Sequence, residues 1–296
     1  MKRLVLLVWI AVFDPALCLA AQPEHDLLVT GSRRVVRFAP DFSVRWEFPA
    51  GNISDVQLLK NGNILFADGR VIEVTPDKEI VFRYEPPAGK EGSFTCRRLE
   101  NGNTLIGENF SGKVMEIAMD GSVVFELQTR FVTTDQHHRM RYVRKLQNGH
   151  YLVNHSGDHL VREYAANGEI VWEQKVPNIA FASERLENGN TLISSLDQIT
   201  EYTPDGTVIW EFKTSELPEL FIKNMTGFHR RANGNLVVGC YAAYDAEGRG
   251  VGMFEITRDK TLLWSYPKPT TGRKVDTNMM GVFMIEPSEK KTELGK

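Results

Sequence analysis

Two histidines and two arginines lie within five residues of one another in a polar stretch of the chain. The stretch runs from Thr133 to Arg141 and also contains His137, His138 and Arg139. Imidazole groups transfer protons near neutral pH, and guanidinium groups bind anions through charge-assisted hydrogen bonds. Adjacent side chains diverge, so the two histidines alone are a weak metal-binding pattern. Two interpretations stay open: a site for an anion or for proton transfer, or a solvated polar loop.

A second set of polar residues recurs at one position relative to a repeated Asn-Gly turn. Four residues before the Asn of each turn lie Gln57, Arg97, Arg144, Glu184 and His229. The alternative to a site is a network of charges that fills a wet channel. From both sets, together with Asp55, which lies six residues before the first turn Asn, we predict two groups of site residues. The ligand-binding group is Asp55, Arg97, Arg139, Arg141 and Arg144, and the weaker catalytic candidates are His137, His138 and His229.

A calcium site is the one metal site that the sequence suggests. Asp55 with Asn224 and Asn278 would offer the carboxylate and amide oxygens that calcium prefers, as in a metal-dependent hydrolase or lactonase. The alternative is that the two Asn side chains hold turns at the starts of strands. We predict no resident cofactor, with calcium as the alternative.

A motif that recurs five times indicates the elements that position these residues. An apolar run ends in Asn-Gly, and a second apolar run follows, with the Asn at positions 61, 101, 148, 188 and 233. Asn-Gly between apolar runs is a strong hairpin signal, and we expect a type I′ turn with positive φ at both residues. The intervals of 40, 47, 40 and 45 residues are typical of a repeated β-sheet unit.

Each repeat reads as four short strands. A second turn follows the first, with Gly121, Gly168 and Gly206 in three repeats but Phe42, Lys78 and Lys260 in the others, where we expect another geometry. The fourth strand carries one large aromatic residue, which we expect to pack between neighbouring sheets: Trp46, Phe82, Phe125, Trp172, Trp210 and Trp264. Six such units without helical periodicity predict an all-β, six-bladed β-propeller of four-stranded antiparallel blades.

The two ends of the chain share one blade. Asn278–Phe283 matches Asn224–His229, a first strand, and Leu27–Gly31 matches Leu236–Gly239, a second strand. The C-terminal strand should therefore complete the first blade, close the ring and remove exposed sheet edges. We divide the chain into a signal peptide (1–21), the propeller (22–288) and a C-terminal tail (289–296).

Composition and the N-terminal segment limit the class of protein. A net charge of −3 argues against a nucleic-acid partner. A basic pair, the apolar run Leu4–Phe13 and small residues before position 22 predict a secretory signal that is too short to span a membrane. We expect an exported protein, periplasmic or extracellular, with no membrane insertion. Cys96 and Cys240 fall on distant blades, which predicts two buried thiols and no disulfide.

The two rims of the predicted ring differ in loop length. Turns that join the first strand to the second, and the third to the fourth, are short and uniform. The longer loops all lie on the other rim: 128–140, 213–225, 241–250 and 267–277. Loops on a rigid scaffold carry function, so we expect the working surface at the channel mouth on this loop-rich rim.

Repeated Asn-Gly-Asn-Thr-Leu-Ile segments, with the stretch Glu201–Phe212, resemble the exported quinoprotein-like and arylsulfotransferase-like propellers. In arylsulfotransferase-like enzymes a His just before the first strand is the sulfated nucleophile, and this chain has Ser54 at that position. The resemblance implies sulfotransfer through channel-mouth His and Arg residues. The quinone dehydrogenases of this group resemble larger rings of eight blades, whereas this chain has six predicted blades.

Three functions follow from these observations. The first is an exported propeller that binds a small ligand, a glycan or a protein partner on its loop-rich channel face, with enzyme activity left uncertain. The second is an arylsulfotransferase-like enzyme, in which arginines hold sulfate oxygens. The third is the metal-dependent hydrolase or lactonase.

Overall fold

A computed structural model of the chain describes residues 21–51, 55–266 and 278–286. The expected signal segment apart from residue 21, the expected tail 289–296 and the expected long loop 267–277 lie outside the described residues. The division of the chain into these segments therefore stays a prediction.

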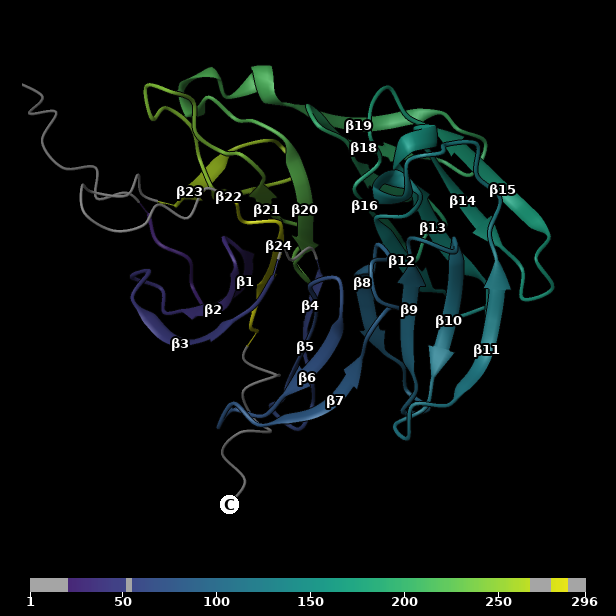
Figure 1. Cartoon of the computed structure of the whole chain (residues 1–296). Coiled ribbons are helices and arrows are strands. Elements are labelled where there is room, and N and C mark those ends of the chain that lie inside the picture. The colour runs from purple at the N-terminus through teal and green to yellow at the C-terminus, as the bar shows by residue number, and fades with distance from the viewer. Residues whose placement is uncertain (1–20, 52–54, 267–277, 287–296) are drawn as a thin grey trace, which may run out of the picture.

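Six four-stranded antiparallel sheets stand around a central channel, as the repeat count predicts (Figure 1). Blade 1 consists of β24 (Gly281–Met284), β1 (Leu27–Gly31), β2 (Arg34–Phe38) and β3 (Val44–Pro49). Blade 2 consists of β4 (Asp55–Leu58), β5 (Ile64–Ala67), β6 (Val71–Val74) and β7 (Ile80–Tyr84). Blade 3 consists of β8 (Ser93–Arg98), β9 (Thr104–Glu108), β10 (Lys113–Ile117) and β11 (Val123–Gln128).

The second half of the ring repeats this order. Blade 4 consists of β12 (Tyr142–Lys145), β13 (Tyr151–His155), β14 (Leu160–Tyr164) and β15 (Ile170–Lys175). Blade 5 consists of β16 (Ala182–Arg185), β17 (Thr191–Ser194), β18 (Gln198–Tyr202) and β19 (Val208–Lys213). Blade 6 consists of β20 (Met225–Arg230), β21 (Leu236–Cys240), β22 (Met253–Ile256) and β23 (Leu262–Ser265).

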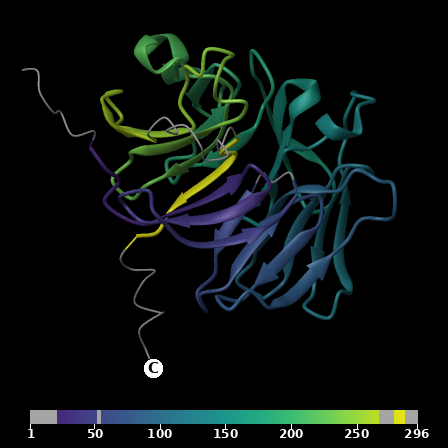
Figure 2. The ribbon, with the colours of Figure 1, turned by 60° about the vertical axis from the view of Figure 1, so that its left-hand side comes forward.

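The C-terminal strand closes the ring, as predicted. β24 pairs antiparallel with β1, with Val282 opposite Val29, and the two strands lie side by side in Figure 2. The backbone just before β24 also packs closely on blade 6, where Met279 N–H donates to Cys240 O. A Cβ at Gly239 would lie 2.1 Å from Met279 O. Glycine is therefore required there for the last strand to reach its place.

Arg231 fastens both ends of the chain to blade 6. Its guanidinium, on a side chain only 6% exposed, lies 2.7 Å from Glu24, 2.9 Å from Glu255 and 2.9 Å from Glu286. Glu24 precedes β1 and Glu286 follows β24, so one side chain holds the two segments that complete blade 1. Burial opposes the charge on Arg231, but these three carboxylates together raise its pKa.

The geometry of the tight turns differs from the type I′ geometry that the sequence predicts. In the first Asn-Gly turn, Gly62 has φ of +85° whereas Asn61 is not in the positive-φ region. Leu59 N–H donates to Asn63 O and Gly62 N–H donates to Leu59 O, which makes a three-residue hairpin loop whose last residue is left-handed. The type I′ prediction is therefore wrong. Only the Gly of each pair needs positive φ.

The second turns share this geometry even where Gly is missing, so the expectation of a different turn is also wrong. Lys78 has φ of +71°, and its N–H donates to Thr75 O just as Gly121 N–H donates to Ala118 O. Phe42 and Lys260 also have positive φ. The repeat imposes the left-handed conformation on whichever residue stands there.

A buried carboxylate on the third strand explains why the residue after Asn-Gly is usually Asn. Asn63 donates to Glu73 at 2.7 Å, and Asn190 donates to Glu201 at 2.8 Å. In blade 4 His150 replaces this Asn, and its Nδ1 lies 2.7 Å from Glu163. The next blade adds a cation: Arg98 reaches Glu73, Lys145 reaches Glu116 and Arg185 reaches Glu163. The Asn of the motif therefore bonds to the Glu within one blade, and the same Glu joins that blade to a cation of the next blade.

The fourth-strand aromatics lie between sheets, as expected. Trp46 Nε1 donates to Pro76 O in the next blade, and Trp172 and Trp210 make the same kind of bond to Pro204 O and Arg258 O. Among the six, Phe82 and Trp264 are buried and the others are partly buried. Cys96 and Cys240 are buried free thiols.

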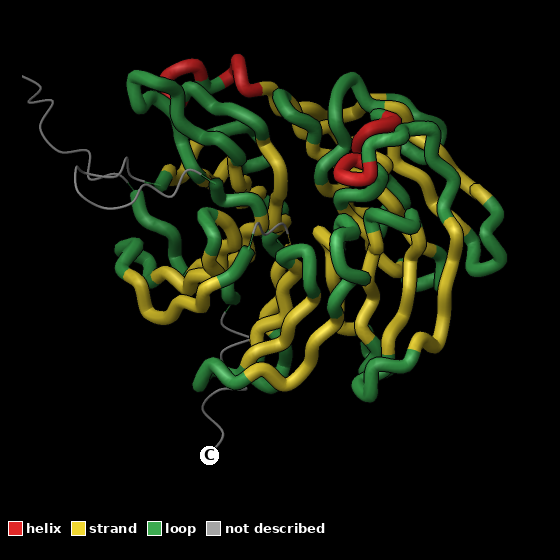
Figure 3. Tube along the Cα trace, viewed as in Figure 1, coloured by secondary structure: helices red, strands yellow, loops and turns green. Residues whose placement is uncertain are grey.

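Short helices mark the loop-rich rim. The described part of the chain has four single-turn 3-10 helices, red in Figure 3: η1 (Gln136–His138), η2 (Ser156–Asp158), η3 (Thr214–Glu216) and η4 (Pro218–Leu220). They lie between β11 and β12, between β13 and β14, and between β19 and β20, which are the connections of the loop-rich rim. None of the helices in the described ranges is long and apolar enough to cross a membrane.

Replacing Lys78 with Gly should stabilise the protein. Lys78 is exposed and left-handed, a conformation that costs a residue with a Cβ about 1–2 kcal/mol, partly offset by the extra chain entropy of Gly. We expect Lys78→Gly to raise the free energy of unfolding by about 0.5–1 kcal/mol in urea denaturation. Gly121→Ala, at the same turn position with nothing within 4 Å of a Cβ, should lower it. A destabilised Lys78→Gly would contradict the shared geometry.

Removing Arg231 should weaken the closure of the ring. Arg231→Leu leaves the buried Glu255 without its cation and releases both chain ends, so we expect a loss of about 3–5 kcal/mol in free energy of unfolding. Arg83→Leu is the matched control, because that pair with Glu85 is 46% exposed on the Arg side and should contribute under about 1 kcal/mol. Equal effects of the two substitutions would show that Arg231 does not hold the ends.

Candidate functional site

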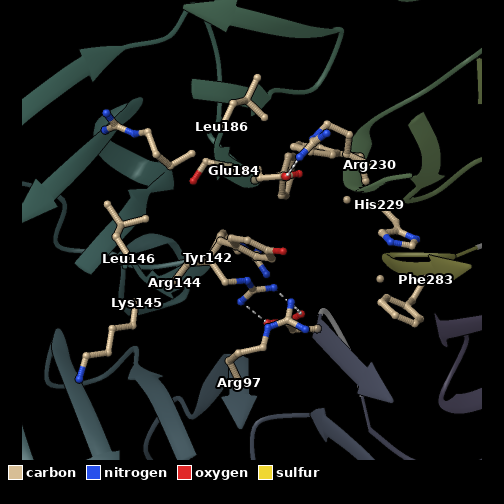
Figure 4. Close-up of a pocket in the computed structure, with 18 of the residues that line it drawn as sticks. Arg97, Tyr142, Arg144, Lys145, Leu146, Glu184, Leu186, His229, Arg230 and Phe283 are labelled. Atoms are coloured by element: carbon tan, nitrogen blue, oxygen red, sulfur yellow. Dashed lines mark hydrogen bonds and ion pairs between the residues drawn. The ribbon is translucent and has the colours of Figure 1, made fainter. Parts of the chain in front are cut away.

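A cavity with a volume of about 720 Å³ lies in the central channel (Figure 4). Its walls come mainly from the innermost strands β4, β8, β12, β16, β20 and β24. It is lined by the cations Arg97, Arg141, Arg144, Lys145, Arg185 and Arg230 and by the anions Asp55, Glu163, Glu184 and Glu187. Positive charges therefore outnumber negative ones six to four inside a chain whose net charge is −3.

The position four residues before each turn does face the channel. Arg97, Arg144, Glu184 and His229 line the cavity, because the first strands of these blades pair with the second strands in the same register. Gln57 differs, because its Oε1 accepts a hydrogen bond from the backbone N–H of Arg98. The register inferred from the turns thus identifies one cavity-lining residue on each of four blades.

Asp55 is held by two arginines. Arg144 donates to both of its oxygens, at 2.8 and 2.9 Å, and Arg97 lies 3.8 Å away. Cys96 N–H and the Thr95 hydroxyl also donate to Asp55, each at 3.1 Å. Burial alone would raise the pKa of Asp55, but Arg144 and Arg97 lower it below its usual value. The cluster of Asp55, Arg97 and Arg144 therefore carries one net positive charge at neutral pH.

This cluster does not fit a calcium site. Both Asp55 oxygens accept from Arg144, so a cation would have to displace a guanidinium. Asn224 Nδ2 donates to Tyr241 O, and Asn278 Oδ1 accepts from Ala242 N–H. The two Asn side chains hold the segment after β21, which is the turn-holding role. Within the described ranges no cluster of three His, Cys, Asp or Glu side chains could hold a metal.

His229 forms part of the cavity wall as a neutral ring. Its ring stacks on Phe283 of β24 at a centroid distance of 4.4 Å. Met284 N–H donates to Nδ1 at 2.8 Å, so the proton of the neutral imidazole is on Nε2. Burial, and then the nearby Arg97, Arg231 and Arg230 against the opposing effect of Glu286, lower the pKa of this histidine to about 4. His229 is thus a hydrogen-bond donor at neutral pH.

Arg230 and Glu184 bridge blades 5 and 6 across the cavity wall. Arg230 Nε and its terminal nitrogen lie 2.9 and 2.8 Å from one oxygen of Glu184, a pair drawn dashed in Figure 4. Both side chains are about a third exposed, so the pair is neutral and reachable from the channel. Tyr142 lies beneath Arg144, whose guanidinium carbon is 3.5 Å from the ring centroid.

Arg141 differs from every other cation that lines the cavity. It is 7% exposed, and its side chain forms no ion pair or hydrogen bond with the described part of the chain. Its guanidinium lies over Phe94 at 4.6 Å and over Phe181 at 5.8 Å. Burial lowers the pKa of Arg141 to about 10, so the group remains charged at pH 7.

The crossover that contains the two adjacent histidines does not enter the cavity. His137 Nδ1 pairs with Glu91 at 3.0 Å, and His138 Nε2 lies 3.8 Å from Asp135. Arg139 donates to Phe110 O and lies over the ring of Phe131 at 4.6 Å. None of the three lines the cavity. They are separated from Arg97, Arg144 and His229, with which the sequence analysis grouped them.

The path of the crossover explains why His137, His138 and Arg139 do not line the cavity. Asp135 caps the single turn η1 by accepting from His137 N–H, and Asn109 donates to the carbonyls of Gln136, His137 and Met140. These bonds hold η1 against blade 3 and turn its side chains toward Glu91 and Asp135. Only Arg141, at the entry to β12, reaches the channel.

The cavity also extends beyond the expected rim. It is lined at one end by Arg141 and Phe181, where strands start, and at the other by residues of the tight turns 146–148 and 186–189. The innermost strands run from one rim to the other, so a cavity between them reaches the plain rim too. We expected the working surface to lie at the channel mouth on the loop-rich rim, but the cavity reaches the other rim as well.

Several wall residues were missed, among them Phe283 and Arg230, and the sequence held a signal for Phe283. Matching Asn278–Phe283 to Asn224–His229 places Phe283 at the same register position as His229, which identifies it as a channel residue. Arg230 follows His229 directly, and strand alternation assigns it to the other face. Its long side chain reaches the channel only because Glu184 on blade 5 is its partner. That partnership has no sequence signal.

Comparison with known proteins shows a propeller fold. The structure is similar to a protein of unknown function from Bacteroides caccae, with a TM-score of 0.76 and 22% identity over 87% of this chain and 97% of that one. It is also similar to virginiamycin B lyase from Staphylococcus aureus, with a TM-score of 0.56 and 13% identity over 84% and 85% of the two chains.

A catalytically inactive variant of that lyase with quinupristin gives a TM-score of 0.57 and 12% identity over 86% of this chain and 87% of that one. No protein-family model matches the sequence, and no curated protein matches it. At these identities the likeness concerns the fold, and the site must be interpreted from its own residues.

Proposed function

We propose that this protein is an exported propeller that binds a small anionic molecule in its central channel. The observation that carries the proposal is the excess of cations inside the cavity of a chain that is negative as a whole. Low-dielectric walls concentrate such a field and raise the local concentration of an oppositely charged ligand. The cluster of Asp55, Arg97 and Arg144 supplies one of the uncompensated charges.

A small molecule suits the channel better than a glycan or a protein partner. A volume of about 720 Å³ lies within the range of small-molecule sites, about 300–1,000 Å³. The wall combines guanidinium groups with the stacked rings of His229 and Phe283, which favours an anion that has an apolar or aromatic body. A protein partner would instead contact the rims, where the charged candidates Arg139 and His137 already have partners in the chain.

Binding is favoured over sulfotransfer by the state of the one candidate His in the cavity. A nucleophilic imidazole needs a free lone pair facing the substrate. In His229 the lone pair of Nδ1 accepts from Met284 N–H, and Nε2 carries the proton. The ring can donate a hydrogen bond to an anion but is not poised for attack. His137 and His138 lie outside the cavity, so neither replaces it.

The proposal predicts a specific loss of anion binding when Arg97 is replaced. The probe is 8-anilinonaphthalene-1-sulfonate, an aromatic anion whose fluorescence rises on binding. Arg97→Gln removes a cavity cation yet leaves Asp55 bonded to Arg144, so the fold should persist and the affinity should fall about five- to tenfold.

Two controls make this test specific. Arg83→Gln removes an exposed arginine outside the cavity and should leave the affinity unchanged. Binding to the wild type should also weaken with salt, because the attraction is electrostatic. An Arg97→Gln protein with native circular dichroism and wild-type affinity for the probe would refute the proposed channel site.

A further inference from the structure

A buried charge without a partner is costly, so the isolation of Arg141 needs an explanation. Protein interiors accept guanidinium groups that are paired or hydrogen-bonded, and an unpaired one destabilises the folded state. Arg144, Arg185 and Arg230 follow this rule, since each faces a carboxylate. Arg141 is the most buried of the cavity cations, and its Nε has no hydrogen-bond partner in the described part of the chain.

Arg141 lies between aromatic rings and the cavity. Phe94 of β8 and Phe181, just before β16, lie over the guanidinium at 4.6 and 5.8 Å. The rings shield the guanidinium, and they compensate only part of its lost hydration. Its N–H groups point in its own plane, and Arg141 and Phe181 line the cavity. A ligand group in the channel can therefore reach the guanidinium, whose edge can form two parallel hydrogen bonds with a planar acceptor.

Neighbouring charges limit what that acceptor can be. The carboxylates of Glu91 and Asp135 act on Arg141 from the crossover side and favour its charged form, with Tyr241 as a further neighbour. Glu91 is 3.0 Å from His137, and Asp135 is 3.8 Å from His138. One guanidinium with two carboxylates nearby suits a single negative charge, because a dianion would be repelled by both.

We propose that Arg141 binds the carboxylate of a monocarboxylate ligand edge-on at the loop-rich end of the channel. This assignment rests on the proposed function and names the ligand class and the residue that recognises it. The carboxylate supplies the in-plane hydrogen bonds that the chain does not, and Phe181 contacts the apolar body of the ligand. Sulfate and phosphate can also accept two hydrogen bonds from a guanidinium, but each carries more than one negative charge at neutral pH, which the nearby carboxylates of Glu91 and Asp135 oppose.

The test uses benzoate as the probe and isothermal titration of the full-length protein, with benzamide as the neutral analogue of the same shape. Inorganic sulfate and phosphate are titrated separately. Arg141→Met keeps an unbranched apolar side chain between the two rings and removes the charge. Arg141→Lys keeps the charge and removes the planar fork. We expect benzoate affinity to fall at least about tenfold in both variants, and benzamide to bind weakly to all three proteins.

Thermal unfolding without ligand separates a binding role from a structural one. Removing an unpaired buried charge should raise the unfolding midpoint of Arg141→Met by about 2–4 °C. Arg144→Met is the matched contrast, because it removes the nearer cation of the buried Asp55 and leaves Arg97 at 3.8 Å, so its midpoint should fall. Opposite shifts for two arginines of one cavity would support the assignment.

Several results would overturn it. Wild-type benzoate affinity in Arg141→Met, equal binding of benzamide, or tighter Arg141-dependent binding of sulfate or phosphate would each exclude a carboxylate site. If Arg141→Met fails to fold or is destabilised, Arg141 has a structural role and the assignment is wrong. If Arg97→Gln loses the sulfonate probe while Arg141→Met keeps benzoate, the channel site stands and only this inference fails.

Discussion

The pairing of β24 with β1 is the constraint on which the channel depends. It joins residues about 250 positions apart, as in the bond from Gly281 N–H to Thr30 Oγ1, and makes blade 1 out of both chain ends. Without it the ring would have two open sheet edges and the channel would lack one wall. Phe283, which stacks on His229, lies on the closing strand itself. The strand that closes the ring therefore also forms part of the cavity wall.

Around the ring, a buried carboxylate that recurs in the repeat connects one blade to the next. Each third-strand Glu accepts from a turn residue of its own blade, and most also reach a cation of the next blade, as Glu73 does with Asn63 and Arg98. Such a charge is tolerated in the interior because its oxygens are hydrogen-bonded, as both oxygens of Glu73 are. The same residues that make the sequence repeat visible are consequently structural. This is why a resemblance carried by the repeat indicates the fold and is weak evidence for chemistry.

The sequence predicts most of this architecture because a strand has a period of two and the turns recur at fixed intervals. Counting back from each Asn-Gly pair identifies Arg97, Arg144 and His229 as channel residues. Turn type is harder, since Asn-Gly suits both a type I′ turn and a three-residue loop that ends in a left-handed Gly. The loop after β11 has no period at all. Its path depends on Asn109, a distant residue that holds three of its carbonyls, so the placement of His137 and His138 could not be inferred.

The cations of the channel fall into two classes that the sequence does not distinguish. Arg144 and Arg230 face carboxylates from other blades, so their charges help to hold the ring and leave little to attract a ligand. Arg141 has two phenyl rings as neighbours and no carboxylate in contact within the described ranges. Stability alone would favour an apolar side chain between those rings, because Met or Leu fills such a space without losing hydration. A charge kept where it weakens the fold is the usual mark of a binding site, since sites are where stability and function conflict. The inference about the ligand class therefore rests on Arg141, a cation that the ring does not need, whereas the channel site itself rests on the excess of cations in the cavity.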